Sequence, residues 1–429
     1  MSDLGYINSY YAATLNEVQS YPSLDSDIEV ETCIIGGGFA GLMTALGLIE
    51  RGHRDIAILE QHRVGWGASG RNGGFVFGGY SLGPRALVKQ VGEKKARQLY
   101  DFTIMGVNLI RQRIAKFNID CDLVDAGVIW ANWFKDQQRL FDEQAFMREQ
   151  MGVEWEYWSP EELREKIRSD RYHGGLFEPN AMHFHPLNYA RGIAREISKG
   201  GGSIFENSPV IDIDTSQATK CVITERGQVR CKNLVVAGGG YIGDLCPPVA
   251  RSILPISTYV MTTQPLGDEL SKLLTTKAAI YDTRFAFDYY RPLADTRILW
   301  GGRISANIRQ PHDLKEILKR DMLRVFPQLE TVNIDYAWDG WMGYSRHQMV
   351  QIGELSPAVW YAVGFGGHGV APTTAAGEII ASAITGQSQD YRLFKPWGLP
   401  WNGGVFGPGM AQLSYWWYQA RDWITEKLE

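Results

Sequence analysis

The stretch ETCIIGGGFAGLMTALGLIERGHRDIAILE, residues 31–60, decides the fold that the sequence predicts. It opens with a short apolar run that passes into three glycines. A helical pattern follows over residues 39–50, and a second apolar run ends on Glu60. A strand, a tight turn, a helix and a second strand in so short a space are typical of a dinucleotide-binding βαβ unit.

Three glycines of this stretch, Gly36, Gly38 and Gly41, have the G-x-G-x-x-G spacing. The first permits a sharp turn, the second lets backbone N–H groups approach a pyrophosphate, and the third lets the helix pack close to the sheet. The helix N-terminus then directs its partial positive charge at the phosphates. An ordinary glycine-rich turn between a strand and a helix is the alternative.

The acid at the end of the second strand, Glu60, follows Gly36 by 24 residues. A carboxylate at this distance can accept hydrogen bonds from both hydroxyls of an adenosine ribose, and it would repel a 2′-phosphate. The sequence therefore favours a dinucleotide other than NADP.

Length and composition limit the class of protein. A chain of 429 residues is too long for one core and predicts two domains. Its 45% apolar and 21% charged content is that of a soluble globular protein, and its net charge of −5 gives no general attraction to nucleic acid or anionic membranes. No apolar run reaches the length of a transmembrane helix.

The cysteines and the N-terminus indicate a compartment. The cysteines form no CxxC pair and are too few for a disulfide framework, and the N-terminus has no basic segment followed by an apolar core. We therefore expect a reduced, cytoplasmic protein. The cysteines are Cys33, Cys121, Cys221, Cys231 and Cys246.

A second glycine-rich segment, RVGWGASGRNGG over residues 63–74, directly follows the strand-end acid. It carries Ser69, Arg71 and Asn72 within four positions. A loop that wraps a polyanionic ligand uses small residues for close approach and an arginine for phosphate. We favour this interpretation over a solvent loop because of the segment's position.

Two further strands enter glycine-rich turns, at residues 233–240 and 359–371, and a small-residue helix is expected over 373–385. Between them, residues 253–335 alternate like an antiparallel sheet. We expect a discontinuous nucleotide domain (28–82, 176–252, 340–395), an interleaved substrate domain (83–175, 253–339), an N-terminal arm (1–27) and an aromatic C-terminal tail (396–429).

Two features allow more than one interpretation. His183 and His185 share a strand face, but no third ligand has recognisable spacing, so we expect no metal site. The tail has many aromatic residues, which either pack on the body or contact a membrane or a partner.

Three glycine-rich units suit the long cofactor FAD better than NAD. The sequence resembles the D-amino-acid oxidase superfamily of FAD-dependent amine oxidoreductases in GGGFAG, the strand-end acid, GASGRNGG, VVAGGGYIGD and GFGGHG. It is more closely similar to the γ-glutamylputrescine oxidoreductase branch in SYYAATLN, GWGASGRNGG, HFHPLN, FDYYRPLADTRILWGGR and FPQL…IDYAWDG. The resemblance implies a Rossmann-like α/β fold with an interleaved antiparallel sheet, as in glutathione reductase and sarcosine oxidase.

The resemblance also implies a set of cofactor contacts. Relatives tether the flavin through a cysteine that residues 340–345 lack, which implies non-covalent FAD. Relatives place a lysine over the flavin for reaction with oxygen, and residues 282–309 contain none, so O2 and another electron acceptor both remain open. The implied FAD contacts are Gly36, Gly38, Phe39, Ala40, Gly41, Glu60, Gln61, Ser69, Arg71, Asn72, Gly73, Gly74, Val210, Ala237, Gly238, Gly367, His368, Gly369 and Val370.

The implied reaction is hydride transfer to FAD from the carbon beside an amine nitrogen, followed by hydrolysis of the imine to an aldehyde. His368 and Tyr290 are candidate catalytic residues. The expected substrate is a γ-glutamylated putrescine or polyamine; glycine, sarcosine or a D-amino acid is the alternative, and a non-catalytic flavin-binding subunit is another. Candidate walls for an ammonium group, or else core residues, are Phe287, Tyr289, Trp300 and Trp130.

Overall fold

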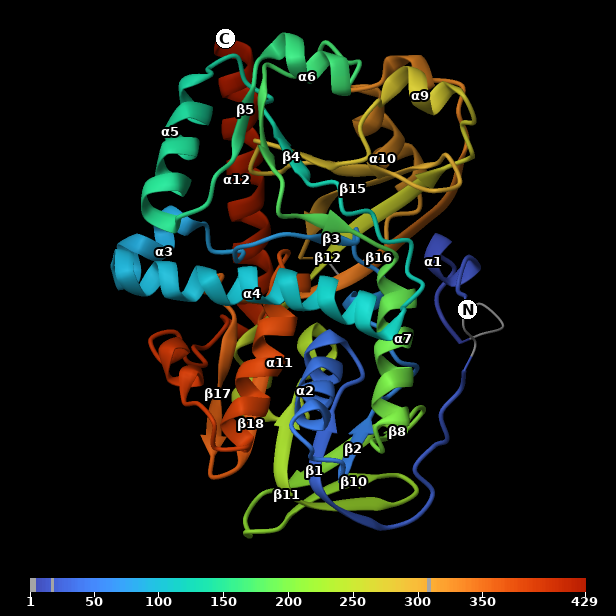
Figure 1. The fold of residues 1–429 in the computed structure, drawn as a ribbon, viewed down its shortest axis with the longest axis vertical. Helices are drawn as coiled ribbons and strands as arrows, with labels where there is room; N and C mark the ends of the chain where they lie inside the picture. The colour runs from blue at the N-terminus through green and yellow to red at the C-terminus, as the bar shows by residue number, and fades with distance from the viewer. Residues whose placement is uncertain (1–4, 17–18, 307–309) are drawn as a thin grey trace.

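The computed structural model describes residues 5–16, 19–306 and 310–429. Parts of the expected N-terminal arm (1–4, 17–18) and of the expected substrate domain (307–309) lie outside the described residues. The elements form two eight-stranded sheets and a two-stranded pair, and Figure 1 shows the two large sheets at opposite ends of the molecule.

The first sheet contains the predicted βαβ unit. Its strand order is β17-β18-β11-β1-β2-β8, with β9 and β10 joined to β11 as a meander. The pairs from β18 to β8 are parallel, and β17 is antiparallel to β18. The strands are β1 (Ile28–Ile35), β2 (Ile56–Leu59), β8 (Ser203–Phe205), β9 (Val210–Asp214), β10 (Lys220–Thr224), β11 (Gln228–Val236), β17 (Gln351–Ser356) and β18 (Val359–Val363).

Both faces of this sheet are buried, which explains the continuous apolar runs of its parallel strands. Along β1, Ile34 packs into the core beneath the helices, and Cys33 and Ile35 pack into the core on the opposite face. Figure 1 shows α2 (Phe39–Glu50), α7 (Pro186–Lys199) and α11 (Val370–Ile384) in front of the sheet. The helix α4 (Glu93–Phe117) lies across them and contributes to the same core.

The second sheet has the order β16-β12-β15-β14-β13-β4-β6-β5. Its strand pairs are antiparallel, as expected, except that β4 and β13 are parallel. α10 (Leu314–Leu323) covers its core. The strands are β4 (Val128–Ala131), β5 (Glu156–Trp158), β6 (Gly175–Glu178), β12 (Ile253–Thr263), β13 (Ala279–Asp282), β14 (Tyr289–Pro292), β15 (Ile298–Ser305) and β16 (Ile334–Ser345).

The domain boundaries remain a prediction, but the strands limit where such boundaries can fall. The boundary expected between residues 175 and 176 lies inside β6, and the one expected between 339 and 340 lies inside β16. Each of these strands is continuously hydrogen-bonded to neighbours of the second sheet.

The remaining elements are further helices and one strand pair. The helical residues 84–117 are divided at Gly92, whose φ of +78° does not belong to a helix. The helix that follows Ser159 begins with a capping box formed by Ser159 and Glu162. These elements are α1 (Tyr10–Ala13), α3 (Pro84–Val91), α5 (Gln138–Phe146), the π-helix Met147–Met151, α6 (Pro160–Lys166), α8 (Pro247–Ala250), α9 (Glu269–Leu273), α12 (Gly407–Leu428), and the β3 (Phe75–Val76) and β7 (Met182–His183) pair.

The two histidines of the HFH segment bind protein groups. The Nδ1 atom of His183 accepts a hydrogen bond from Arg291, and its Nε2 atom donates to the carbonyl of Lys277. The Nδ1 atom of His185 caps α7 by accepting from the amide of Asn188. In the described part of the chain, no group of three metal-ligating side chains is placed to hold an ion, and no helix there is both long and apolar enough to cross a membrane.

Burial and the neighbouring Arg291 lower the pKa of both His183 and His185 to about 3. In the unfolded chain each imidazole binds a proton below a pKa of about 6.5. The unfolded state therefore binds more protons between these values, so the free energy of unfolding is highest above pH 6.5 and falls as the pH decreases toward 3.

We predict that His185→Asn removes part of this acid sensitivity. Asparagine is a favourable N-cap, so the helix cap is retained and the titrating group is lost. Between pH 7 and pH 5 the wild-type protein should lose about 2 kcal/mol more unfolding free energy than the variant, measured by urea titration. If the unfolding free energies of the wild type and the variant fell equally between pH 7 and pH 5, the depressed pKa of His185 would be contradicted.

Candidate functional site

A cavity of about 1160 Å³ lies between the carboxyl ends of the first sheet's strands and the inner face of the second sheet. Loops at the carboxyl edge of parallel strands are the usual ligand site of open α/β sheets. The cavity exceeds the usual size of a pocket for one drug-sized ligand. It can therefore hold a large cofactor together with a substrate.

The first glycine turn forms one end of this cavity. Gly36 has a φ of +109°, and a Cβ atom there would lie 2.7 Å from the carbonyl oxygen of Ala237. A side chain at Gly41 would meet the carbonyl oxygen of Gly36. The turn thus requires glycine at both positions, and α2 begins close against the sheet.

The first turn of α2 directs backbone donors at the cavity. The hydroxyl of Ser69 accepts a hydrogen bond from the amide of Phe39 at 2.8 Å. The amides of Ala40 and Gly41 have no intrahelical partner, as in any first helical turn. Such donors together with the helix dipole suit a phosphate group.

Glu60 lies at the same end, on the rim of the cavity. Its two carboxylate oxygens accept hydrogen bonds from the amides of Gly37 (2.7 Å) and His62 (2.9 Å). Burial raises the pKa of the Glu60 carboxyl to about 7, although the two amides act in the opposite direction. The carboxyl is held in a fixed orientation where it can accept from hydroxyl groups.

Arg71 brings a buried positive charge to the cavity and forms no ion pair with any residue that the structure describes. Its Nε atom donates to the carbonyl of Trp66 at 2.7 Å, and the guanidinium lies 4.0 Å from the centre of the Trp66 ring. Its Nη2 atom is buried and forms no hydrogen bond within the described part of the chain. A buried donor without a partner is costly, so this atom indicates a ligand that accepts hydrogen bonds here.

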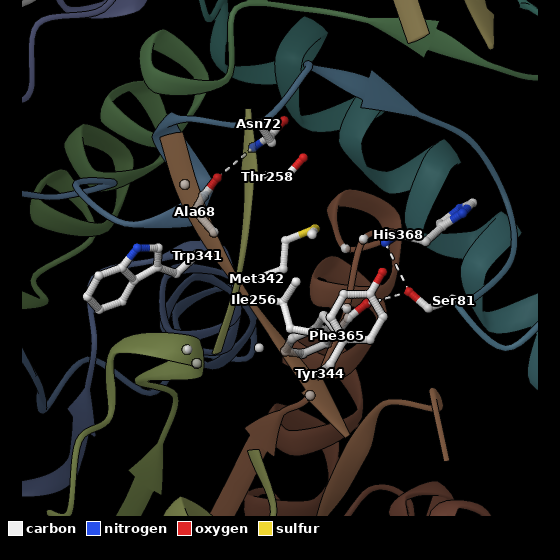
Figure 2. A pocket seen from close by; sticks show the side chains of 18 of the residues that line it. Ala68, Asn72, Ser81, Ile256, Thr258, Trp341, Met342, Tyr344, Phe365 and His368 are labelled. Atoms are coloured by element: carbon white, nitrogen blue, oxygen red, sulfur yellow. Dashed lines mark hydrogen bonds between the residues drawn. The ribbon is translucent and has the colours of Figure 1, made fainter. Parts of the chain in front are cut away.

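The neighbouring Asn72 has an internal role. Its amide nitrogen donates to the carbonyls of Ala68 and Ser69, and its amide oxygen accepts from the amide of Gly74. Figure 2 shows this side chain folded back toward Ala68. Asn72 therefore holds the shape of the loop that presents Arg71.

The C-terminal glycine loop borders the middle of the cavity, where Ser81 holds it (Figure 2). The Ser81 hydroxyl accepts from the amide of His368 and donates to the carbonyl of Phe365. The imidazole of His368 packs 4.2 Å from the ring of Phe77 and donates to that residue's carbonyl. Burial lowers the pKa of His368 to about 4, so the ring is neutral at pH 7.

The far end of the cavity has aromatic walls and ion-paired charges. Phe77, Tyr281 and Tyr289 form the walls together with Trp130 and Phe287. Among the lining arginines, Arg284 pairs with Asp282 and Asp288, and Arg303 pairs with Asp321. A further lining arginine, Arg346, directly follows the end of β16, away from these walls; it is exposed, and it forms no ion pair with any residue that the structure describes.

One candidate catalytic residue, Tyr290, is wrong as a cavity residue. It is fully buried, and its ring stacks on Trp300 with centroids 4.6 Å apart, in the core beneath α10. Successive side chains of a strand point to opposite faces, so Tyr289 faces the cavity and Tyr290 faces away. Trp300 shares that core and is also not a cavity wall.

The family of the chain follows from comparison with known proteins. Residues 31–383 match the DAO family model, described as FAD dependent oxidoreductase. The chain is 36% identical over 400 residues to the Escherichia coli protein named Gamma-glutamylputrescine oxidoreductase, covering 91% of each chain. The chain belongs to the DAO family of FAD-dependent oxidoreductases.

Other similarities agree with this family. A Haemophilus influenzae protein named Probable oxidoreductase OrdL is 34% identical over 402 residues and 92% of each chain. The glycine oxidase structure from Bacillus cereus superposes with a TM-score of 0.72 at 21% identity, over 86% of this chain and 98% of that one. That likeness confirms the predicted α/β fold.

The residues present fit FAD, the cofactor of the DAO family. The glycine turn would be obstructed by a Cβ atom, Arg71 has a buried donor without a partner, and the cavity connects both glycine loops. Two of the expected contacts, Gly41 and Gly74, do not line the cavity. They pack closely against the backbone carbonyls of Gly36 and Phe184. Those that line the cavity are Gly36, Gly38, Phe39, Ala40, Glu60, Gln61, Ser69, Arg71, Asn72, Gly73, Val210, Ala237, Gly238, Gly367, His368, Gly369 and Val370.

Sequence reasoning missed several lining residues. The ring of Tyr241 stacks on Trp341 with centroids 5.0 Å apart, and both residues line the cavity. Tyr241 also lies beside the guanidinium of Arg71. Tyr241 directly follows the glycines of VVAGGGYIGD, and Trp341 follows Gly340; an aromatic residue next to a glycine is the signal that could have identified both. Nothing in the local sequence distinguishes Ser81 from any other loop serine.

We predict that Arg71→Met lowers the affinity for FAD by about tenfold to a hundredfold, because a charge-assisted hydrogen bond contributes about 1.5–3 kcal/mol. Methionine keeps much of the side-chain volume beside Trp66. The dissociation constant can be measured by flavin fluorescence during titration of apoprotein. Arg54→Met, at an exposed loop outside the cavity, is the matched control; equal affinities for both variants would contradict the role of Arg71.

Proposed function

We propose that this chain oxidises the C–N bond of a γ-glutamylated putrescine or a related polyamine conjugate. Hydride would pass from the carbon beside the amine nitrogen to FAD, and the imine would hydrolyse to an aldehyde. The observation that carries the proposal is the 36% identity, along nearly the whole of both chains, to the Escherichia coli protein with that substrate in its name.

FAD, when bound, supplies the hydride acceptor. The chain's own residues would bind the cofactor and the substrate and orient them. The phosphates would be held by Gly38, Ala40 and Arg71. Glu60 would accept hydrogen bonds from the ribose hydroxyls. We propose non-covalent binding, since residues 340–345 contain no cysteine.

On the substrate side, the aromatic walls formed by Phe77, Tyr281 and Tyr289 would surround an amine and keep water away. An amine must be neutral to lose hydride, so no strong protein base is required. Neutral His368, which donates to the carbonyl of Phe77, would position the glycine loop instead of transferring a proton.

The cavity also carries a charge that suits the glutamyl part of such a substrate. Arg346 lines the cavity at an exposed position and is not ion-paired with any described residue, whereas Arg284 and Arg303 are bound to aspartates. A guanidinium binds a carboxylate well. Arg346 would accordingly bind the carboxylate of the glutamyl group.

The same arginine supports a second candidate, oxidation of a small or N-methyl amino acid such as glycine or sarcosine, because these substrates also carry a carboxylate. A non-catalytic subunit is disfavoured by a cavity larger than a cofactor alone needs. O2 or another acceptor would reoxidise FAD, and we propose a cytoplasmic enzyme on the basis of its cysteine composition.

We predict that γ-glutamylputrescine bleaches the flavin absorbance of the anaerobic holoenzyme, and that free putrescine, glycine and sarcosine do so at least about tenfold more slowly, since each lacks part of the proposed contacts. Rates are measured by stopped-flow absorbance, and admission of air then tests O2 as acceptor. Faster bleaching by glycine or sarcosine would contradict the proposed substrate and indicate an amino-acid oxidase.

We predict that Arg346→Gln raises KM for γ-glutamylputrescine by about twofold to fivefold, with little change in kcat, because an exposed ion pair made equally in ground and transition states contributes to binding alone. Putrescine, which has no carboxylate, should be unaffected. Arg226→Gln, at an exposed turn outside the cavity, is the control. Equal effects of Arg346→Gln on both substrates would refute the assignment.

A further inference from the structure

The C-terminal helix α12 packs on the body through one polar face. Asp422 accepts hydrogen bonds from the amides of Phe285 and Ala286, and the ring of Tyr418 stacks on Phe285 at 4.1 Å. Tyr415, at the same face, is buried. The spacing of these residues along α12 is that of one helical face.

The opposite face of α12 is apolar and exposed to solvent. Trp417 is 70% exposed and Trp423 is 60% exposed, and no described residue covers either one. Large contiguous apolar surfaces are rare on soluble monomers and mark interaction sites. We call this surface the outer face of α12; its other exposed apolar residues are Leu413, Trp416, Ile424 and Leu428. Phe406 and Met410 are also exposed, but they line the cavity.

The charges of α12 are segregated between the two faces. Glu426 pairs with Arg171 and Arg324, and Glu429 accepts a hydrogen bond from the amide of Lys135. The acid Asp422 is likewise engaged by the body, as described above.

The two bases of α12 flank the tryptophans. Arg421 and Lys427 are exposed, and neither forms an ion pair with any residue that the structure describes. The guanidinium of Arg421 lies 4.9 Å from the centre of the Tyr418 ring, at the edge of the body side. Cations therefore border the outer face, while the three acids are occupied on the body side. Net charge alone, at −5, does not reveal this arrangement.

We propose that the outer face of α12 docks on the surface of a bilayer that contains anionic phospholipids. Tryptophan prefers the interface between lipid and water, and helices that lie in this interface combine aromatic residues with Lys and Arg. Lipid phosphates would pair with Arg421 and Lys427, for which the described residues supply no acid.

A second copy of the chain fits this face less well. In a two-fold arrangement, the α12 helices of two copies would pack with their outer faces together. The bases of each copy would then contact the apolar surface of the other copy, where no acid is free to pair with them. Acids Asp422 and Glu426 would first have to leave their partners on the body. An anionic surface satisfies the bases with the helix docked as it stands.

Docking would also orient the cavity. The helix that carries the outer face lines the cavity through Ala411, Ser414 and Tyr418. Docking would therefore place α12 between the cavity and the bilayer.

The test is co-sedimentation of the holoenzyme with vesicles of phosphatidylcholine, with and without phosphatidylglycerol. We expect binding to the anionic vesicles, weakened by added salt. Trp416→Ser with Trp417→Ser should abolish binding, and Arg421→Glu with Lys427→Glu should reduce the partition constant by about tenfold or more. Leu355→Ser, at an exposed apolar residue elsewhere, should bind like the wild type.

Retained flavin absorbance and thermal unfolding temperature show that each variant is folded, and neither depends on the identity of the substrate. The proposal is overturned if wild type binds neither kind of vesicle, or if the tryptophan variant binds as tightly as Leu355→Ser. A dimer in light scattering that the tryptophan variant dissociates, without vesicle binding by wild type, would assign the face to a second copy instead.

Discussion

The arrangement of the site depends on one buried arginine, Arg291, which has no carboxylate partner among the described residues. Its guanidinium donates to the carbonyls of Gly73 and Phe184, to His183 and to the hydroxyl of Tyr11. A buried cation is tolerated only when every donor finds an acceptor. Four distant segments must therefore lie in one place before this charge can be buried.

This requirement explains why the site is built from separate parts of the chain. Arg291 belongs to β14 of the second sheet, and Gly73 belongs to the loop that presents Arg71 to the cavity. The same loop packs so closely on the second sheet that a Cβ atom at Gly73 would lie 2.5 Å from the ring of Tyr289. The cofactor loop is thus fixed against the substrate wall, and the cavity has a defined depth.

The local parts of this arrangement could be predicted from the sequence. A βαβ unit, its glycines and the capping box at Ser159 depend on contacts within a few residues, which sequence spacing records. The placement of Tyr290 could not be predicted, because β14 presents aromatic rings to both faces and alternation alone does not say which face borders the cavity. Ser81 was missed because its partner, the loop at His368, lies 287 residues away.

The aromatic residues of the chain show how one composition serves several physical purposes. Trp300 fills a core, Trp341 borders the cavity, and Trp417 lies exposed on α12. Composition cannot separate these roles, since each places an apolar ring beside different neighbours. What separates them is the charge nearby. The ring of Tyr290 stacks on Trp300 in the core, whereas the ring of Tyr241, which stacks on Trp341 in the cavity wall, lies beside the guanidinium of Arg71. Exposed cations border the outer face that carries Trp417. The charge beside an aromatic residue, more than the ring itself, therefore indicates which of these surfaces awaits a ligand.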